Sequence, residues 1–494
     1  MNATSPPLAV SLALFAALEA AGIRHCHWKS NEHLGAGLAG ETDLDVLVDA
    51  DRAAETDQVL LGQGYRRFRS AAWGRFPGLF DWLGFDHETG RMVHIHLHHQ
   101  LLTGLRFVKE HHLPWEQAVL DSRVRDQRFG VQVTHPALEL VMLLARVALK
   151  NTHPVARGLV REFDYLLEGI DFREVEVWAH QILPPADATA ALTILLARRH
   201  LERGALAEMR RRVSRALTRD RRMSSAEAAV RGPMNRARFA AARLARRLSL
   251  DVQLGKRLEP GGALVAVIGC DGAGKSTVAA ELARWLAWKV DARTIYLGVG
   301  EGRVGVRVRV LRGLARSAEK RTPEAPGPPR PATPGSMPTR FHVPSVMRDV
   351  GSGLLNNAMA DERMAKLREA AGFRAAGGVL LTDRFPQTQF PGIYDGPRTT
   401  RSDHDSALRR AFAGRELRLY ESMAAMAPDV VIKLHVPVEV AIGRKPGHDA
   451  RGIQRKCDLT MALEFPHSAV FDVDAARPLE AVLLDCKRIL WSRL

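Results

Sequence analysis

The residues with the most specific chemistry form one glycine-rich run near the middle of the chain. It has the spacing G-x-x-x-x-G-K-[S/T], with an apolar stretch at 263–268 before it and a helical pattern at 277–288 after it. In such a loop, backbone N–H groups and a helix N-terminus form a site for nucleotide phosphates. Lys275 would reach the β- and γ-phosphates, and Ser276 would offer its hydroxyl to Mg²⁺. The pattern predicts ATP and Mg²⁺ as cofactors, with the nucleotide bound by Gly269, Cys270, Asp271, Gly272, Ala273, Gly274, Lys275, Ser276 and Thr277.

An aspartate–arginine pair follows the apolar run Val379–Thr382. A carboxylate one strand away from the phosphate loop can hold the metal's water shell, directly or through Ser276. The neighbouring guanidinium has a planar donor geometry that binds a phosphate through two hydrogen bonds. Asp383 is therefore a candidate magnesium ligand, and Arg384 is a candidate for holding the phosphate of an acceptor.

A basic segment, 444–456, follows a later apolar run at 430–436. A glycine-containing segment with several cations at this point is typical of a lid that closes over a nucleotide and stabilises the transferring phosphoryl group. Arg444 and Arg451 are the catalytic candidates in it. The alternative interpretation is a solvated basic loop with no catalytic role.

The elements that must position these residues alternate along the chain. Apolar, strand-like runs at 263–268, 294–297, 379–382, 430–436 and 469–473 are separated by helical stretches. This alternation predicts an α/β fold, with a parallel sheet sandwiched by helices. Ligands of such sheets bind at the carboxyl ends of the strands, which is where the glycine-rich loop begins.

Together, Asp271, the Asp383–Arg384 pair and the basic segment after Pro428–Leu434 resemble the thymidylate kinase family over roughly the last 235 residues. The resemblance implies a P-loop fold like that of nucleoside monophosphate kinases and phosphoryl transfer from ATP to an acceptor. It implies that Asp271 touches the acceptor's sugar hydroxyl or assists catalysis, and that Arg384 holds its phosphate. The catalytic residues expected on these grounds are Lys275, Asp271, Asp383, Arg384, Arg444 and Arg451.

Two departures from this family fall where the acceptor is chosen. Tyr296–Gly302 stands where thymidylate kinases have Arg-Glu-Pro, and Pro386–Phe390 replaces the family's segment after the Asp-Arg pair. The sequence therefore predicts a nucleotide or a similar small molecule as the acceptor without identifying it.

A second group of acidic residues lies near the amino terminus. Within the strand-like run 43–48, residues two apart share a face, so Asp43 and Asp45 point one way while Leu44 and Val46 point into the core. Two carboxylates so close repel each other unless a cation lies between them. Asp43 and Asp45 are therefore candidates for a second Mg²⁺ site.

This region resembles the nucleotidyltransferase superfamily, in which a small-residue turn precedes a strand carrying Asp-x-Asp. Ser30 stands in the turn, but Lys29 replaces the family's glycine. A third carboxylate is not evident, because the expected strand, Met92–His99, carries His96 where the family shows an acid. His94, His96 and His98 share one face of that strand and could bind a transition metal. Simple solvation or hydrogen bonding is the favoured alternative.

The organisation that follows is a nucleotidyltransferase-like α/β domain at 1–130, a helical extension at 131–206, arginine-rich linker helices at 207–259 and a thymidylate kinase-like domain at 260–494. The stretch from Arg210 to Arg247 holds thirteen arginines and two acidic residues. It could contact nucleic acid or an anionic membrane, but a solvated linker helix is favoured. The insert 303–345 is basic and proline-rich, which predicts disorder or a flap.

The whole chain has 494 residues, a formal net charge of +16 and four scattered cysteines. Few cysteines and no run of about 20 apolar residues predict a cytoplasmic protein without a membrane span. The predicted function is an ATP-dependent phosphotransferase acting on a small acceptor. The alternatives are an ATP-binding regulator or scaffold, and nucleotidyl transfer by the amino-terminal domain. A homodimer is also compatible with the sequence.

Overall fold

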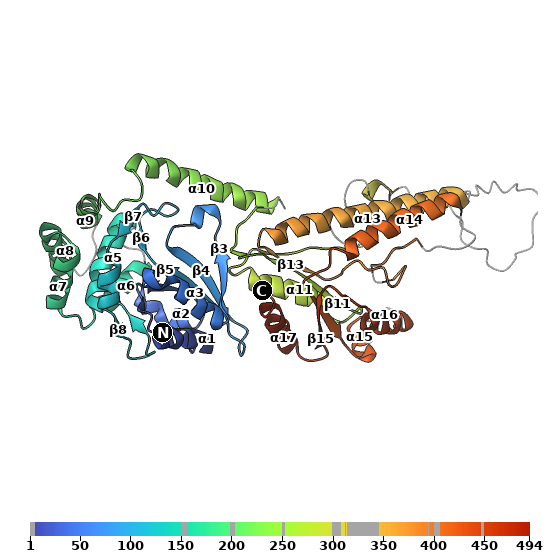
Figure 1. Cartoon of the computed structure of the whole chain (residues 1–494), viewed down its shortest axis with the longest axis horizontal. Coiled ribbons are helices and arrows are strands. Elements are labelled where there is room, and N and C mark those ends of the chain that lie inside the picture. Colours follow the sequence, from blue (N-terminus) through green and yellow to red (C-terminus); the bar gives the residue numbers. More distant parts are fainter. Residues whose placement is uncertain are drawn as a thin grey trace, which may run out of the picture. The chain divides into compact units, whose positions relative to one another are not determined.

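The computed structural model describes residues 5–150, 157–197, 203–248, 252–298, 308–311, 313, 345–393, 395–399, 406–445 and 449–494. The chain divides into two compact units, Met1–Glu259 and Pro260–Leu494 (Figure 1). The proline-rich stretch Thr322–Pro338, predicted to be disordered or a flap, lies outside the described residues.

The first unit is built on an eight-stranded mixed sheet with the order β10-β3-β4-β5-β2-β1-β9-β8. The β2–β5 and β1–β9 pairs are parallel, and the other pairs are antiparallel. A two-stranded sheet, β6–β7, lies apart from it. The strands are β1 (His25–His27), β2 (Asp43–Val48), β3 (Arg66–Arg69), β4 (Leu79–Phe85), β5 (Met92–His98), β6 (Leu101–Thr103), β7 (His111–Leu113), β8 (Val124–Arg125), β9 (Gln132–Val133) and β10 (Arg257–Leu258).

One face of this sheet is covered by α1 (Ala9–Ala20), α2 (Leu34–Leu38) and α3 (Ala53–Gly62). Leu44 and Val46 of β2 are fully buried on that face, in one apolar cluster with α1. The predicted alternation is therefore confirmed, because Asp43 and Asp45 lie on the opposite face. The polar residues of β2 are left for the side of the sheet that α1 does not cover.

The helical part of the first unit is larger than the sequence predicted. Helix α5 (Pro136–Lys150) begins at Pro136, whose fixed φ suits a first turn, and its apolar residues are buried. The predicted boundary between residues 206 and 207 falls inside α9, which packs on α5. The extension therefore includes the first arginines of the block Arg210–Arg247. Its helices are α4 (Glu116–Asp121), α5, α6 (Arg157–Leu167), α7 (Phe172–Ile182), α8 (Pro185–Ala197) and α9 (Arg203–Ala216).

Arg219, Arg221 and Arg222 lie in the segment after α9, and the last six arginines of the block lie in α10 (Ser225–Arg247), whose first turn is capped by the Ser224 hydroxyl. Only Ala228, Gly232 and Ala242 of α10 are buried, so most of its arginines face solvent, as expected for a solvated helix. Beyond it, Arg257 and Leu258 form β10 and pair with β3, so the predicted linker 207–259 also supplies a strand to the sheet.

The second unit has a five-stranded parallel sheet with the order β12-β13-β11-β14-β15. Four predicted strands are confirmed to within two residues. The predicted strand 294–297 is displaced, because pairing with β13 runs from Ala292 to Thr294, directly after the buried residues Val290 and Asp291. The strands are β11 (Ala263–Gly269), β12 (Ala292–Thr294), β13 (Val379–Thr382), β14 (Val430–His435) and β15 (Ala469–Asp474).

Helices lie on both faces of this sheet (Figure 1). Leu264, Ala266 and Ile268 of β11 pack in one apolar cluster with α13, α14 and the loop after α16. Helix α11 contacts β11, β12 and β13, and α17 contacts α11 and β15. The helices are α11 (Lys275–Leu286), α13 (Ser345–Ala375), α14 (Ala407–Ala424), α15 (Val438–Arg444), α16 (Ala450–Ala462) and α17 (Leu479–Trp491).

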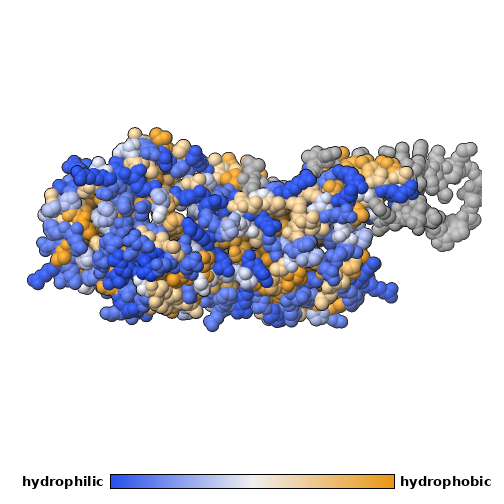
Figure 2. Space-filling view, in the orientation of Figure 1, coloured by the Kyte–Doolittle hydropathy of each residue, from blue (hydrophilic) through white to orange (hydrophobic). Residues whose placement is uncertain are grey.

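Hydrophilic residues cover most of the visible surface, interrupted by scattered apolar residues (Figure 2). Among the helices in the described part of the chain, none is long and apolar enough to cross a bilayer.

Candidate functional site

The glycine-rich loop leaves the carboxyl end of β11, the central strand of the second unit's sheet, and ends at the first turn of α11. Gly272 and Gly274 have φ angles of +88° and +89°, which side-chain-bearing residues rarely adopt. A Cβ on Gly272 would also lie 2.6 Å from the carbonyl oxygen of Ala441. The glycines are therefore required by the backbone, and the loop presents the free N–H groups of the α11 N-terminus to one side.

Lys275 is the first residue of α11, and its ammonium lies over the loop. Its Nζ donates to the carbonyl oxygen of Cys270 at 2.9 Å and lies 3.8 Å from Oδ1 of Asp271. Burial lowers the pKa of Lys275, while Asp271 acts in the opposite direction. The charged lysine is thus held inside the loop by a carbonyl and a carboxylate, both of which a phosphate could replace as its partners.

Asp271 connects the loop to the basic segment. Nζ of Lys456, in α16, donates to Oδ2 of Asp271 at 2.5 Å. Burial raises the pKa of Asp271, but Lys456 and Lys275 outweigh burial, and the net pKa is below its ordinary value. Asp271 is therefore a charged carboxylate shared by two lysines.

The predicted magnesium ligands lie together. Asp383 follows β13, the neighbour of β11, and Oγ of Ser276 donates to its Oδ2 at 2.6 Å. Two oxygen donors at the carboxyl ends of adjacent parallel strands suit a hard cation such as Mg²⁺, which binds few protein ligands and retains water. The residues present therefore fit the predicted metal.

A cavity of about 250 Å³ opens beside the loop, and most of its charged side chains are basic. Arg363 of α13 is buried and donates to Asp395 at 2.8 Å, and Arg384 lies 3.8 Å from the same carboxylate. Five cations against two carboxylates favour an anionic ligand. The charged residues of the lining are Lys275, Arg363, Arg384, Arg398, Lys456, Asp271 and Asp395.

The two arginines expected to act from the lid do not line this cavity in the described part of the chain. Arg444 ends α15 and donates to the carbonyl oxygens of Ala475 at 3.1 Å and Gly272 at 3.4 Å, so it braces the glycine-rich loop from outside. Arg451 is exposed in the first turn of α16. Among the described residues of the basic segment, Lys456, on the same helix as Arg451, is the cation that lines the cavity and pairs with Asp271.

Sequence reasoning missed Arg363, Asp395 and Lys456 as members of the site. Lys456 belongs to the basic segment, and its spacing of five residues from Arg451 gave no reason to prefer it. Arg363 lies in the middle of a 31-residue helix, and only the packing of α13 on α14, where it contacts Tyr420, aims it at Asp395. Neither Arg363 nor Lys456 lies in a local sequence pattern that would have marked it as part of the site.

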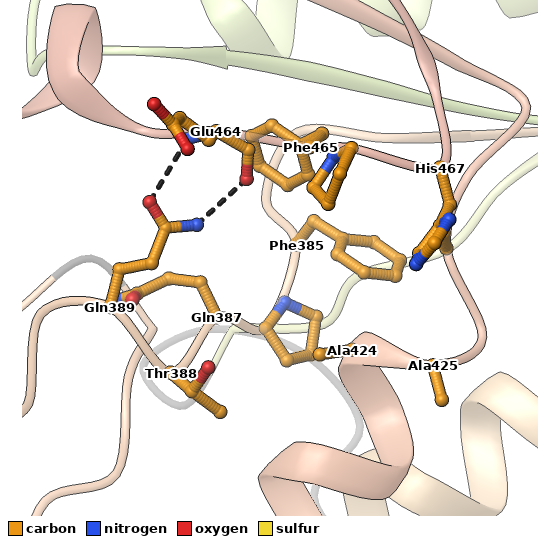
Figure 3. Close-up of a pocket in the computed structure, with 12 residues that line it drawn as sticks. Phe385, Gln387, Thr388, Gln389, Ala424, Ala425, Glu464, Phe465 and His467 are labelled. Carbon is orange, nitrogen blue, oxygen red and sulfur yellow. Dashed lines mark hydrogen bonds between the residues drawn. The ribbon is translucent and has the colours of Figure 1, made fainter.

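A second cavity of the second unit, about 280 Å³, lies between the segment after Arg384, the end of α14 and the loop before β15 (Figure 3). Gln389 exchanges two hydrogen bonds with the backbone of Glu464, and Gln387 donates to the carbonyl oxygens of Phe390 and Ile393. These amides anchor the segment at which the chain departs from thymidylate kinases. The departure therefore has a structural role next to Arg384.

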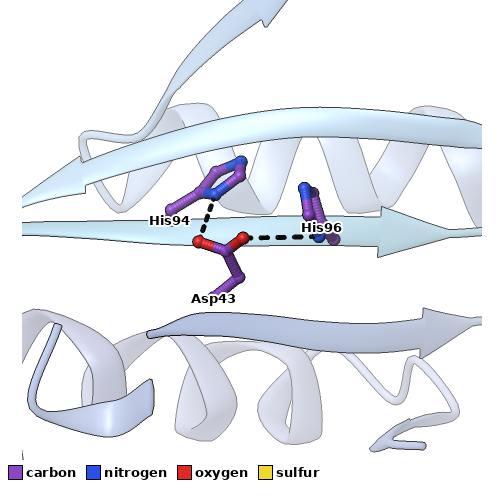
Figure 4. A group of neighbouring side chains, drawn as sticks. All are labelled: Asp43, His94 and His96. Atoms are coloured by element: carbon purple, nitrogen blue, oxygen red, sulfur yellow. Dashed lines mark hydrogen bonds and ion pairs between the residues drawn. The ribbon is translucent and has the colours of Figure 1, made fainter. Parts of the chain in front are cut away.

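In the first unit, the predicted acidic strand carries a dense polar cluster on its uncovered face. Asp43, His94, Asp45 and His96 are neighbours across the parallel pair β2–β5. Nδ1 of His94 lies 2.7 Å from Oδ1 of Asp43, and Nε2 of His98 lies 3.0 Å from Oδ1 of Asp45 (Figure 4 shows Asp43, His94 and His96). His94 and His98 are buried and hydrogen-bonded to carboxylates, whereas the His96 side chain is partly exposed.

A third carboxylate, which the sequence analysis did not find, belongs to this cluster. Asp81 of β4 is paired with His96 across β5, and its Oδ1 lies 3.0 Å from Nε2 of His94 and 3.3 Å from Nε2 of His96. Its signal was weak, because the other residues of β4 are mostly apolar or aromatic. His96 lies on β5, next to β2, as expected, and Asp81 adds a carboxylate to the same cluster from β4, one strand further along the sheet.

Two lysines neutralise part of this charge. Lys29, which replaces the nucleotidyltransferase glycine, pairs with Asp45, and Lys256 lies 3.0 Å from Oδ1 of Asp81. Burial raises the pKa of both aspartates, but their histidine and lysine partners outweigh it and hold both pKa values well below the usual range. For His96, burial lowers the pKa, but Asp45 and Asp81 outweigh it and raise the net value.

No model of a known protein family matches the sequence. The uncharacterized ATP-binding protein YghS of Escherichia coli (strain K12) is 30% identical over 239 residues, which are 47% of this chain and 93% of YghS. The uncharacterized ATP-binding protein YghR of the same strain is 30% identical over 223 residues, 44% of this chain and 83% of YghR. Among solved structures, deoxyadenosine kinase from M. mycoides with bound dATP matches with a TM-score of 0.26 and 15% identity, over 46% of this chain and 98% of the kinase. The chain therefore belongs to the family of the ATP-binding proteins YghS and YghR.

Proposed function

We propose that the second unit binds Mg·ATP in the loop Gly269–Thr277 and transfers the γ-phosphoryl group to a small anionic acceptor, as its resemblance to thymidylate kinase implies. The observation that carries this proposal is the cavity beside the loop, which is lined both by residues of the predicted nucleotide site and by a cluster of cations. The names of YghS and YghR support the ATP-binding part.

Each residue of the site has a role in this reaction. The loop amides and Lys275 would hold the β- and γ-phosphates, and Ser276 and Asp383 would hold Mg²⁺, which would neutralise phosphate charge. Arg384 holds an anionic group of the acceptor, and Lys456 offsets charge that develops on the transferred group. Positioning of both reactants supplies most of the expected rate enhancement, because phosphoryl transfer needs little covalent chemistry from the protein.

The acceptor is expected to carry a phosphate or a carboxylate. Asp395 already neutralises part of the charge of Arg363 and Arg384. An acceptor anion would replace Asp395 as the partner of Arg384, whose side chain is 38% exposed. A nucleotide or a similar small phosphorylated molecule meets this requirement and suits a cavity of this volume. ATP supply places the proposed reaction in the cytoplasm.

The proposal is tested by release of ADP from Mg·ATP with a panel of anionic and neutral small molecules. We expect turnover to require an anionic acceptor and Lys275→Ala to lower it by about 10²–10³-fold. Lys289→Ala, beyond the other end of α11, is the control and should keep the wild-type rate. ATP consumption independent of every acceptor would favour the regulator or scaffold alternative instead.

A second candidate activity, nucleotidyl transfer in the first unit, is favoured by one observation. Asp81 supplies a third acid near Asp43 and Asp45, as that reaction's metal site requires. The pairing of Asp45 with Lys29 and of Asp81 with Lys256 weighs against it, because both carboxylates already have cationic partners. Incorporation of labelled nucleotide that depends on Asp43 and Asp45 would establish it.

A further inference from the structure

The histidine cluster of the first unit, defined here as Asp43, His94, His96 and Asp81, plays no part in the proposed phosphoryl transfer. Asp43 comes from β2, the two histidines from β5 and Asp81 from β4, so three neighbouring strands contribute. One ligand atom from each of Asp43, His94 and His96 lies within 4.8 Å of the others (Figure 4). This is the spacing that side chains need to share one metal ion.

Both imidazoles turn the same nitrogen toward Asp81. Nε2 of His94 and Nε2 of His96 lie 3.0 Å and 3.3 Å from Oδ1 of Asp81. A carboxylate only accepts hydrogen bonds, so in the tautomer with the proton on Nε2 both rings can donate to Asp81. This tautomer leaves the Nδ1 atom of each ring as the one available to coordinate.

The two Nδ1 atoms face the carboxylates of β2: Asp43 is near both rings, and Asp45 is near His96. The Nδ1 of His94 lies 2.7 Å from Oδ1 of Asp43, and the Nδ1 of His96 lies 3.9 Å from its Oδ2. Nitrogen lone pairs and an ionised carboxylate repel one another unless a cation lies among them. Protonating both rings would place two positive charges on imidazoles whose centroids are 4.3 Å apart, whereas one metal ion would satisfy all three groups.

The distances and donor types suit a transition metal better than Mg²⁺. Bonds of about 2.1 Å in a tetrahedral site separate ligand atoms by about 3.4 Å, which lies between the two Asp43 distances. Imidazole nitrogen is a preferred ligand of Zn²⁺ and its neighbours in the periodic table, whereas Mg²⁺ prefers oxygen. A carboxylate that accepts from the outer nitrogen of a ligating histidine is the usual partner of such ligands, and Asp81 does this for both rings.

The cluster is also accessible from one side. His94 is fully buried, but the side chains of Asp43 and His96 remain 29% and 27% exposed. An ion could therefore reach the site from solvent and would keep a coordination position directed outward. Oδ1 of Asp45, 3.5 Å from Nδ1 of His96, is the nearest further carboxylate oxygen on β2.

We propose that the first unit binds one Zn²⁺ ion through Asp43, Nδ1 of His94 and Nδ1 of His96, with Asp81 orienting both rings. All four residues of this site belong to the first unit.

The test uses the full chain, stripped of metal with a chelator and titrated with Zn²⁺ against a competing zinc-binding dye. Co²⁺ replaces Zn²⁺ in a parallel titration, because its visible spectrum reports tetrahedral coordination. We expect one equivalent to bind, Asp43→Asn and His96→Gln each to weaken binding by at least about tenfold, and Asp81→Asn to weaken it by about 10–100-fold. His435→Gln, which removes a histidine paired with Asp472 on the second unit, is the matched control and should leave binding unchanged.

The variants chosen keep the approximate shape of each side chain, and melting temperatures in chelator identify any that fail to fold. Asp43→Asn and His96→Gln alter partly exposed positions, so loss of zinc by a folded variant supports the site directly. Zinc binding that survives His94→Gln/His96→Gln, or that is lost only in Cys457→Ser, would overturn the proposal. So would a wild-type chain that binds no zinc, or one that binds Mg²⁺ there in preference, as a nucleotidyl-transfer site would.

Discussion

The glycine-rich loop of the second unit and the histidine cluster of the first unit concentrate charge in opposite ways. The loop is a contiguous stretch of nine residues, and its binding groups are mostly backbone amides held by two positive-φ glycines. The cluster consists of side chains from three strands, β2, β4 and β5. Strands β4 and β5 follow each other in the sequence, whereas β2 joins them only because it pairs with β5 in the sheet. A contiguous backbone site can be recognised from the sequence, whereas a cross-strand site depends on strand order and register.

The two sites also differ in the sign of the charge that their side chains leave unbalanced. Around the loop, cations outnumber carboxylates, and the excess is suited to an incoming anion. In the first unit, Asp45 and Asp81 each have a lysine partner, and the histidines lie between the carboxylates. The first arrangement is completed by an anionic ligand, and the second is completed by a cation shared among Asp43 and the two histidines.

The largest expected effect is on stability, from removing the carboxylate that the cluster shares. Asp81→Ala would leave Lys256, the buried His94 and the partly exposed His96 without their common acceptor, so we expect the free energy of unfolding of the first unit to fall by about 3–5 kcal/mol. Calorimetry of the full chain in chelator measures this. Asp472→Ala, whose side chain is 65% exposed, should change stability by less than about 0.5 kcal/mol. Equal effects would mean that the cluster is not an integrated network.

The next effect tests the backbone character of the loop. Gly272→Ala places a Cβ at φ +88° and 2.6 Å from the carbonyl oxygen of Ala441, so we expect a loss of about 1–3 kcal/mol of stability and at least tenfold weaker ATP binding. Gly372→Ala, inside α13 where a Cβ meets nothing within 4 Å, should instead stabilise by about 0.5–1 kcal/mol. Chemical denaturation and nucleotide titration of both variants make the comparison, and a tolerated Gly272→Ala would contradict the geometry of the loop.

Acid should destabilise the first unit through its buried histidines. Burial lowers the pKa of His25, His27, His94 and His98, that of His98 to about 3. Below an unfolded value of about 6.5 the unfolded chain binds more protons, so stability is full above that pH and falls as the pH decreases toward the folded values, by up to about 1.4 kcal/mol per pH unit for each histidine. His98→Gln should reduce this slope by up to one proton in denaturation experiments between pH 8 and 4. An unchanged slope would show that His98 is protonated in the folded state.

The smallest effect concerns Lys456. Its removal leaves Asp271 with Lys275 as its remaining lysine partner, so we expect Lys456→Ala to lower phosphoryl transfer by about tenfold while ATP affinity changes little. Initial rates with a saturating acceptor measure this. Arg451→Ala, on the same helix but exposed, is the matched control. If Arg451→Ala had the larger effect, the lid would act through the residue that the sequence first indicated.

The structure also shows which features the sequence could predict. The loop, Ser276 and Asp383 were predictable because each belongs to a local strand-to-helix or strand-end pattern, and the parallel sheet followed from alternating apolar runs. Strand β12 begins two residues and ends three residues before its predicted bounds, because tertiary packing decides that pairing with β13 begins at Ala292. Leu44 and Val46 were assigned to the core correctly because strand periodicity is local.

Residues brought in by tertiary structure were not predictable. Asp81 joins Asp43 only through the order β4-β5-β2, and Lys256 reaches Asp81 only because β10 pairs with β3. Arg363 and Asp395 meet through packing between α13 and a distant loop. The departure at Lys29 has a physical reason that the sequence could not supply, because its partner Asp45 is sixteen residues away on the adjacent strand.

The central claim, that the loop at the end of β11 binds a nucleotide, is tested most directly by calorimetric titration of the full chain with ATP, with and without Mg²⁺. We predict one site whose affinity depends on Mg²⁺ and falls at least tenfold in Lys275→Ala, with Lys289→Ala unchanged. A chain without Mg²⁺-dependent affinity for ATP, or a Lys275→Ala variant that binds as tightly as the wild type, would contradict the claim.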